Sequence, residues 1–333
     1  MTNTALAAHT IATAAPARRW VSAVLWTLVL PFAGWAFLRV FGWEPKFRWS
    51  QLVSFTPYAA AASLVPTALA LVLRRWPVAL TALAVSVVLV AVVAPRAFGD
   101  RNPVVSGPAL RVLTANLYHS AVTADTLLDS IQRIRPDVLA VFEYEPGLRE
   151  AMDKAGIAEF LPFHAVFDDA YAKGTAIYAR YPMTPGKLIP GDGPNQVATT
   201  LSLPGDQLVD FVAVHACAPS GGWRSACWES SVRALPPAGG RLRILGGDFN
   251  STLDHRVMRD LIATGYRDAA DVTGMGLRTT WPYIGQPWFI RKIAIDHVLA
   301  DPRIAVRAFR VIPMPGSDHR AVLTDLTLPG DVR

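Results

Sequence analysis

Hydrophobic residues form long unbroken runs in the first third of the chain and short, often alternating runs in the rest. The long runs lie at residues 20–40, 52–73 and 76–94, and none carries a charge in its middle. Each has about the 20 residues that a helix needs to cross a hydrocarbon core. Aromatic and arginine residues gather at their ends, where membrane helices place interfacial anchors. The pattern predicts a disordered tail at residues 1–19 and three transmembrane helices within 20–94.

The orientation of these helices follows from the basic residues between them. Arg74 and Arg75 lie in a very short turn after the second run, where the rule that basic loops stay in the cytoplasm is most reliable. This predicts a multi-pass protein of the cell membrane with an extracytoplasmic C-terminal part. Basic residues near the ends of the other runs nearly balance the number of positive charges on the two sides of the membrane. A rival interpretation takes the first run as a cleaved signal peptide with Arg18 and Arg19 as its basic part, but the two later runs favour spans.

A linker rich in proline and glycine is expected at residues 95–109, and a globular domain at 110–333. Short apolar or alternating runs in this domain predict strands, at 110–116, 137–142, 174–180, 208–214, 242–245, 293–300, 305–312 and 321–328. Two amphipathic helices are predicted, one capped by Thr123 and ended by Pro136, the other at 254–264. Short strands with few, scattered helices favour an α/β fold of stacked sheets flanked by helices over a regular βαβ repeat.

Charge is unevenly distributed between these two parts. Residues 1–109 contain nine basic and two acidic residues, a net charge of +7, whereas residues 110–333 have a net charge of −1. The positive charge of the chain therefore belongs to its apolar third. The globular domain as a whole lacks the basic footprint of a protein that binds long nucleic acids, although a local patch is compatible with the count.

The most informative polar residues follow the strand predicted at 242–245. Gly246 and Gly247 come first, and then Asp248 and Asn250. Residues i and i+2 of an extended chain point to the same side, so Asp248 and Asn250 can face one small site. The glycines would let another backbone or a ligand come close. The alternative is an Asx turn that merely ends the strand.

Other polar residues also stand where predicted strands begin or end, namely Asn116, Glu143, His215, Asp296, Asp318 and His319. An unpaired buried carboxylate such as Glu143 is costly and requires a cation, and carboxylates suit Mg²⁺, or Mn²⁺ in its place. A histidine held by an aspartate can take a proton from water near neutral pH. No zinc-type spacing, P-loop or Gly-x-Ser-x-Gly motif occurs in the sequence. The set therefore favours metal-assisted hydrolysis of phosphate esters.

In their order along the chain, these motifs resemble those of the endonuclease/exonuclease/phosphatase superfamily, which has the deoxyribonuclease I-like fold. They are Asn116, Glu143, His215-x-x-x-Pro219, Gly247-Asp248-Phe249-Asn250, Ile295-Asp296-His297 and Ser317-Asp318-His319. The resemblance covers residues 110–328 and implies a four-layer α/β sandwich with the site at one edge of two packed mixed sheets. It also implies a Mg²⁺-dependent hydrolase of phosphodiester or phosphomonoester bonds.

The resemblance assigns a role to each residue of the metal and phosphate site. Glu143 would bind the metal, and Asn116 and Asp318 would support the metal and the phosphate. Asp248 would orient the attacking water, and Asn250 would contact phosphate.

The resemblance also makes His319, paired with Asp296, the general base, and gives His215 a role in stabilising phosphate or assisting the leaving group. Two departures are visible. Phe142 stands where members often have glutamine before the metal-binding glutamate, which could change how the metal's surroundings are held. The strand predicted at 174–180 offers His215 no acidic partner, which favours phosphate binding over proton donation.

The loop after His215 carries Cys217 and Cys227, which could form a disulfide or remain two thiols. Aromatic residues near the motifs could form a substrate wall, with core packing as the alternative; they are Trp223, Trp228, Trp281, Trp288 and Phe289. The expected partners are a phosphate-ester substrate (nucleic acid, or a lipid or small molecule) and the lipid bilayer, and no obligate protein partner is evident. A non-catalytic membrane scaffold and a transporter are rival functions. Against them, every catalytic residue type is present, and no predicted span has an ionisable residue in its middle.

Overall fold

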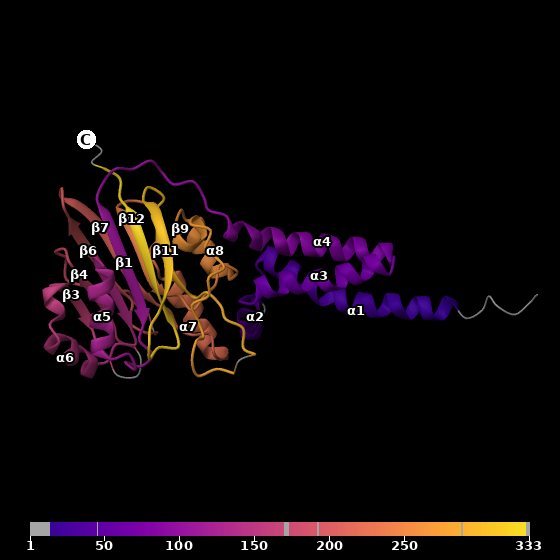
Figure 1. Cartoon of the computed structure of the whole chain (residues 1–333), viewed down its shortest axis with the longest axis horizontal. Helices are drawn as coiled ribbons and strands as arrows, with labels where there is room; N and C mark the ends of the chain where they lie inside the picture. The colour runs from indigo at the N-terminus through magenta and orange to yellow at the C-terminus, as the bar shows by residue number, and fades with distance from the viewer. Residues whose placement is uncertain (1–13, 45, 170–172, 192, 288, 331–333) are drawn as a thin grey trace, which may run out of the picture. The chain divides into compact units, whose positions relative to one another are not determined.

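Figure 1 shows the computed structural model, which describes residues 14–44, 46–169, 173–191, 193–287 and 289–330. The chain forms two compact units. One consists of three apolar helices, and the other contains two β-sheets, their flanking helices and the segment Gly42–Phe55. Residues 14–19 of the tail predicted to be disordered are helical, whereas residues 1–13 and Trp288 lie outside the described residues.

The apolar unit contains α1 (Ala14–Phe41), α3 (Thr56–Val72) and α4 (Trp76–Val93). Mostly small side chains are buried between these helices, and many large apolar side chains remain exposed on their outer faces. A helix that is apolar on every side is suited to a membrane. Within the described residues, two stretches are long and apolar enough to cross one, Arg19–Phe41 and Trp76–Ala97.

The second predicted span, residues 52–73, differs in the structure. Leu52 and Val53 belong to a separate short helix, α2 (Lys46–Val53), and α3 has only 17 residues. That length is below the ~20 residues that a perpendicular crossing needs. Pro57 favours a new helix start here, because it lies in the first turn of α3 where its missing N–H costs no hydrogen bond. The described chain therefore offers two candidate spans and one shorter apolar helix rather than three full-length spans.

The second unit is built on two six-stranded mixed sheets. In spatial order, the strands of the first sheet are β11 (Ala305–Pro313), β12 (Arg320–Thr327), β1 (Ala109–Asn116), β2 (Val138–Phe142), β4 (Thr175–Ala179) and β3 (Phe163–Phe167). Those of the second are β5 (Lys187–Leu188), β6 (Val197–Leu203), β7 (Gln207–His215), β8 (Leu242–Asp248), β10 (Asp296–Ala300) and β9 (Arg267–Asp268). Both sheets have a central parallel pair, β1 with β2 and β7 with β8, flanked by antiparallel strands.

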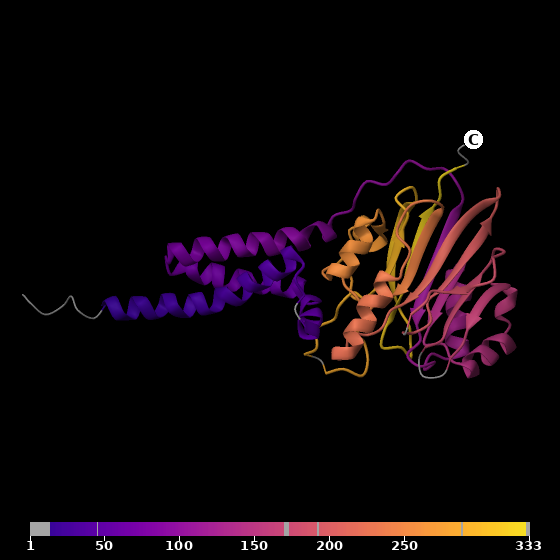
Figure 2. The ribbon, with the colours of Figure 1, turned by 180° about the vertical axis from the view of Figure 1, so that it is seen from behind.

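Four layers follow from the packing of these sheets. Their inner faces meet in one apolar core, to which central strands of both sheets contribute. Two helices, α5 (Ala124–Ile134) and α6 (Pro146–Lys154), pack their apolar sides on the outer face of the first sheet. Another two, α7 (Gly222–Arg233) and α8 (Arg256–Ala263), cover the outer face of the second sheet (Figure 2). The predicted sandwich of two mixed sheets between helices is confirmed.

Most predicted elements of this unit are found close to their expected bounds. Thr123 caps α5, where its side chain accepts a hydrogen bond from the backbone N–H of Thr126. Elements that the pattern did not predict are β3, β5, β6, β9, α6, α7 and three short helices, α9 (Ala269–Val272), η1 (Ala94–Ala97) and η2 (Ile157–Glu159).

The stretch predicted as a linker, residues 95–109, lies against the sheets and helices of its own unit. The Arg96 guanidinium makes a buried two-point ion pair with the Asp254 carboxylate, at 2.6 and 2.7 Å. Further along, the Asn102 side chain donates a hydrogen bond to the carbonyl of Val306. The chain between the last apolar helix and β1 is therefore fixed to the domain at several points.

Candidate active site

Four strand ends carry predicted site residues to one edge of the two sheets. In the first sheet Asn116 ends β1 and Glu143 follows β2; in the second, His215 ends β7 and Asp248 ends β8. Both pairs are parallel, so the carboxyl ends within each pair lie side by side. The Asn116 amide then joins the two sheets, because its Nδ2 donates to Glu143 Oε1 and to Asp248 Oδ2, at 3.1 Å each.

Gly247 allows the close packing at the end of β8. Its φ is 148°, and a Cβ atom there would lie 2.1 Å from the carbonyl oxygen of Val214 and 2.4 Å from the ring of Phe142. Glycine is therefore required, as the sequence predicts for a close backbone approach. Phe142, the departure from the family pattern, is fully buried, with its ring centroid 5.7 Å from that of His215. It contributes packing beside the site and no polar group.

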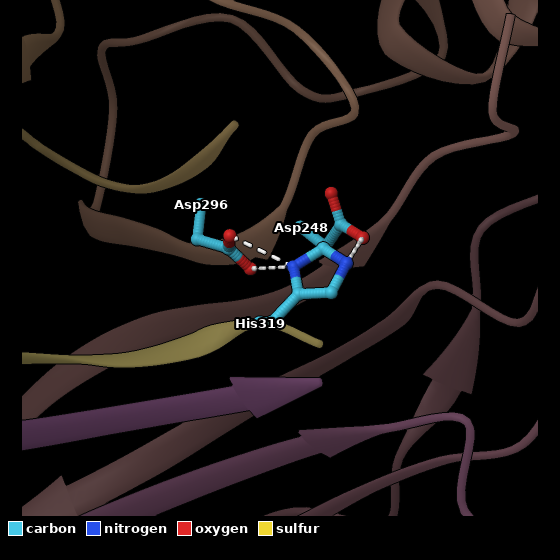
Figure 3. A group of neighbouring side chains, drawn as sticks. All are labelled: Asp248, Asp296 and His319. Carbon is cyan, nitrogen blue, oxygen red and sulfur yellow. Dashed lines mark hydrogen bonds and ion pairs between the residues drawn. The ribbon is translucent and has the colours of Figure 1, made fainter. Parts of the chain in front are cut away.

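His319 and Asp296 form a buried pair beside Asp248 (Figure 3). The Nδ1 atom of His319 lies 3.0 and 3.2 Å from the two carboxylate oxygens of Asp296, and its Nε2 lies 3.8 Å from Asp248 Oδ2. Asp296 begins β10 directly opposite Asp248, and His319 immediately precedes β12. Asp296 therefore fixes the orientation of the imidazole and directs Nε2 toward Asp248.

The surrounding charges favour a proton on this histidine. Burial alone would lower the pKa of His319, but the charges of Asp296 and Asp248 and the hydrogen bond to Asp296 outweigh it and raise the pKa to about 10. Burial also raises the pKa of the Asp248 carboxyl, although the charge of His319 opposes that change. A cation bound nearby would lower the pKa of His319, because its charge repels that of the imidazolium. A pKa of about 10 leaves the imidazole protonated at pH 7, so it can accept a proton from water only when a bound cation has lowered that pKa.

The Asp248, Asp296 and His319 group could itself be a metal site, since ligand atoms of the three lie within 4.8 Å of one another. Their hydrogen bonds favour a different role. Both oxygens of Asp296 contact His319 Nδ1, and the oxygens of Asp248 accept from the Asn250 backbone N–H at 2.8 Å and from Asn116. This is the arrangement of a general base with an orienting carboxylate.

Glu143 and Asp318 form a second acidic group, which fits a divalent cation better. Burial raises the pKa of the Asp318 carboxyl, and the charge of Glu143 raises it further, although His319 and Trp281 oppose. Asp318 Oδ2 accepts a hydrogen bond from Trp281 Nε1 at 2.8 Å, whereas Oδ1 is buried and has no hydrogen-bond partner in the described part of the chain, with His319 Nε2 4.0 Å away. A buried carboxylate oxygen without a partner is costly unless it meets a cation. Two carboxylates are also the hard oxygen donors that Mg²⁺ and Mn²⁺ prefer.

A loop that the sequence gave no reason to single out holds Glu143 in place. Glu143 has a φ of 56°, and Tyr118, His119 and Ser120 also have positive φ values. The His119 backbone N–H donates to Glu143 Oε2 at 2.8 Å, and the Ser120 backbone N–H and hydroxyl donate to the Glu143 carbonyl. Left-handed backbone at ordinary residues costs about 1–3 kcal/mol each and clusters at functional sites. His119 thus helps to position Glu143 through its backbone N–H.

His215 is buried beside Glu143, with 4.0 Å between its Nε2 and Glu143 Oε1. Burial, and then the charge of His319, lower the pKa of His215 to about 3, so the ring is neutral at pH 7. Its Nδ1 has no hydrogen-bond partner among the described residues. Asn250 lies close by, where its Nδ2 donates to the carbonyl of Ala216 at 2.9 Å. This bond ties the loop after β8 to the residue that follows His215.

The other residues raised by the sequence divide between the site and the packing around it. Cys217 and Cys227 are joined by a disulfide, with their Cα atoms 5.8 Å apart. Trp228 is buried and donates to the Ser251 hydroxyl, which makes it a packing residue rather than a substrate wall. His297 contacts Asp268 at 2.8 Å, away from the His319–Asp296 pair.

Comparison with known proteins agrees with this geometry. Residues 113–319 match the model of the endonuclease/exonuclease/phosphatase family. The chain belongs to this family. The match contains all eight predicted site residues, which the structure brings to one edge of the sheets, and family membership points to a phosphate-ester hydrolase. No curated protein matches the sequence.

Solved structures with the same fold share little sequence with this chain. They include an endonuclease/exonuclease/phosphatase from Beutenbergia cavernae (18% identity, 67% of this chain and 72% of that chain covered, TM-score 0.51). D. rerio TDP2 in complex with a single-strand DNA product covers 66% of this chain and 99% of its own, with 14% identity and a TM-score of 0.56. The match to the human Nocturnin catalytic domain with a bound sulfate covers 68% of this chain and 99% of that chain, with 16% identity and a TM-score of 0.50. At these identities the likeness extends to the fold alone.

The hydrogen bond from Trp281 to Asp318 leads to a first prediction. Trp281→Phe keeps an aromatic ring but removes the donor to Asp318 Oδ2. Groups that orient metal-binding carboxylates typically contribute 10–100-fold to metal affinity, so the half-saturating Mg²⁺ concentration for activity is expected to rise about 10-fold. Trp76→Phe, at an exposed tryptophan of α4, is the matched control. An unchanged Mg²⁺ dependence in Trp281→Phe would show that this bond does not serve the metal.

Proposed function

We propose that this family member is a membrane-anchored, divalent-metal-dependent phosphoesterase that hydrolyses phosphodiester or phosphomonoester bonds by attack of an activated water on phosphorus. The observation that carries the proposal is the His319–Asp296 pair, directed at Asp248 and accompanied by the carboxylates of Glu143 and Asp318. A base for water and a site for a cation, close together, are what this reaction requires.

In the proposed reaction His319 Nε2 takes a proton from water, and Asp296 holds the ring through Nδ1. Asp248 accepts a hydrogen bond from the same water and so orients it toward phosphorus. Glu143 and Asp318 would hold Mg²⁺ or Mn²⁺, and Asn116 would hold Glu143 and Asp248 in place through the hydrogen bonds that it donates to them. When bound, the cation polarises a phosphoryl oxygen and offsets the charge that develops on it.

The remaining polar groups bind the phosphate. His215 is neutral at pH 7 and therefore cannot protonate a leaving group as an imidazolium; we assign it a hydrogen bond from its N–H to a phosphoryl oxygen. Asn250 Nδ2 donates only one of its two N–H groups to Ala216, and we assign the other to phosphate; both N–H groups of Asn116 are already used, by Glu143 and Asp248. Neutral donors fixed in place stabilise a developing oxyanion without reorganisation.

The membrane anchor in this proposal has α1 and α4 as full-length spans and α3, with 17 residues, as a crossing at the short end of the range of about 17–25 residues, which leaves the catalytic domain outside the cytoplasm. The basic turn at Arg74 and Arg75 supports this orientation. The disulfide between Cys217 and Cys227 supports it too, because disulfides persist in oxidising compartments. The packing of Gly42–Phe55 within the domain unit agrees, since three spans leave that segment and the domain on one side.

The proposed substrate belongs to one of two classes, nucleic acids or small phosphate esters. The TDP2 structure contains a DNA product, which supports a nuclease. The net charge of −1 over residues 110–333 and the proposed anchor support a phospholipid or another small phosphate ester.

The test uses the full chain in lipid nanodiscs, incubated with single-stranded DNA, RNA, phospholipid vesicles and bis(p-nitrophenyl) phosphate. We expect hydrolysis of one class in Mg²⁺, a loss of about 100-fold or more in EDTA because the metal contributes several kcal/mol, and recovery on adding Mg²⁺ or Mn²⁺. Glu143→Gln should reproduce the loss, whereas Glu150→Gln, at an exposed glutamate of α6, should not. Hydrolysis that is insensitive to both EDTA and Glu143→Gln would overturn the proposal.

A further inference from the structure

We propose that the segment between α1 and α3, Gly42–Phe55 (the connecting segment), is a positioning element of the active site, because it holds the two loops that follow His215 and Asn250. The inference rests on the proposed function and deepens it. Along the chain the segment joins two apolar helices, yet it belongs to the same compact unit as the sheets. Ser50 and Val53 in it are 5% and 1% exposed. A loop that served only as a connection would be solvated.

The first contact is with the loop after β7. The Gln51 side chain donates from Nε2 to the carbonyl of Pro219 at 3.0 Å. Pro219 ends the five-residue motif that begins with His215, and the Ala216 carbonyl within it accepts the side-chain amide of Asn250. Gln51 thus contacts the loop that links both phosphate-binding candidates.

The second contact is with the loop after β8. The Ser50 carbonyl accepts a hydrogen bond from His255 Nε2 at 2.7 Å, and both residues are buried. On the other side of the same ring, Nδ1 accepts from the Thr252 backbone N–H at 2.8 Å. Because Thr252 is two residues beyond Asn250, the imidazole bridges the connecting segment to the site loop. Both ring nitrogens are used, which fixes the neutral tautomer with its proton on Nε2.

The helix α7 links these two contacts, and α2 of the connecting segment packs against it. The Trp228 ring of α7 lies edge-on to His255, with centroids 4.9 Å apart, and its Nε1 donates to the hydroxyl of Ser251, which directly follows Asn250. One residue earlier, Cys227 is bonded to Cys217 in the loop after β7. The connecting segment, α7 and the two site loops therefore form one contiguous network of contacts.

This network predicts how the connecting segment affects the reaction. His215 and Asn250 would contact phosphate, and a displacement of about 1 Å in such groups can cost up to about 100-fold in rate. Loss of one neutral hydrogen bond removes about 1 kcal/mol of the stabilisation that holds the loop in place. Its effect should appear in kcat, since positioning matters most in the transition state, and not in the pH profile, because no titrating group of the site is changed.

The test compares two isosteric replacements in the full chain. Gln51→Met removes the bond to Pro219, whereas Gln207→Met removes a glutamine-to-proline-carbonyl bond of similar length, 2.9 Å to Pro329, at the opposite end of β7. Gln51→Met is expected to lower kcat about 5-fold, as loss of one hydrogen bond implies, with KM and the pH profile unchanged. Gln207→Met is expected to leave kcat unchanged. Because each variant loses one hydrogen bond of similar length, both are expected to lower Tm by similar amounts.

A second readout does not depend on activity. Hydrogen–deuterium exchange of the peptide containing His215–Pro219 should increase in Gln51→Met and not in Gln207→Met. His255→Gln can keep a donor to Ser50, and it is expected to retain more kcat than His255→Leu, which leaves the Ser50 carbonyl unpaired. Equal kcat and equal exchange in Gln51→Met and the wild type would overturn the proposal. If the wild type hydrolyses no phosphate ester, the proposed function fails, and the exchange data alone decide whether the segment positions the loop.

Discussion

Replacing His319 by alanine is expected to lower kcat/KM for phosphate-ester hydrolysis by about 10³-fold, because general base catalysis typically contributes 10²–10⁴-fold. The structure supports this role through one atom, Nε2. The other ring nitrogen, Nδ1, lies 3.0 and 3.2 Å from the two carboxylate oxygens of Asp296, and this contact leaves Nε2 facing Asp248. Alanine at this position leaves Asp296 buried without its partner and removes the group that would accept the proton.

The measurement is a steady-state assay on the substrate class that the wild type hydrolyses, with the same Mg²⁺ concentration for every variant. His164→Ala is the control, because this exposed histidine lies on the edge strand β3. It should retain wild-type activity. If His319→Ala kept more than about a tenth of wild-type kcat/KM, a loss below the usual range for a general base, another group would have to activate the water.

The fold of the domain could be predicted where the apolar pattern is strong. Alternating or continuous apolar runs identify the central strands, such as β1 and β8, and a threonine cap and an apolar stripe identify α5. The helix α7 has neither signal, since Gly221 caps it without a side-chain hydrogen bond and few of its apolar residues are buried. Packing on the second sheet and a disulfide to the preceding loop stabilise it, and both are long-range effects.

The second predicted span shows a different limit. An unbroken apolar stretch from Leu52 to Leu73 predicts one helix by composition, but the chain breaks at Ser54 and Phe55. The helix before the break, α2, belongs to the same compact unit as the sheets and packs on α7. Hydropathy does not distinguish an apolar segment that packs against a folded domain from one that is buried in lipid, because both remove apolar surface from water.

Residues of the candidate site could be predicted where they stand at the ends of strands and follow the order of the family's motifs along the chain. Asn116, Glu143 and Asp248 are brought together because parallel strands place their carboxyl ends at one edge. Trp281 and His119 were not predictable as positioning groups. Trp281 reaches Asp318 across 37 residues of sequence, and His119 acts through its backbone N–H, which any residue type supplies.

The second large effect is expected from Arg96, a residue of the stretch predicted as a linker. Arg96→Ala is expected to lower the free energy of unfolding of the domain by about 3–5 kcal/mol, the usual cost of leaving one member of a buried ion pair without its partner. The pair is two-pronged, at 2.6 and 2.7 Å, and the side chains of Arg96 and Asp254 are 8% and 0% exposed. Asp254 also follows Asn250 by four residues, so the loss would disturb the site loop as well.

Denaturant unfolding of the full chain, followed by tryptophan fluorescence, measures this effect. Arg233→Ala is the control, because its pair with Glu229 is about half exposed and exposed pairs contribute under about 1 kcal/mol. The double variant Arg96→Met with Asp254→Leu should recover much of the loss, since apolar replacement of a buried ion pair is often neutral. Equal destabilisation by Arg96→Ala and Arg233→Ala would contradict the prediction. The same reasoning predicts that a fragment beginning at residue 104 is poorly stable, because it lacks Arg96, which pairs with the buried Asp254, and the connecting segment, whose Ser50 carbonyl accepts from His255.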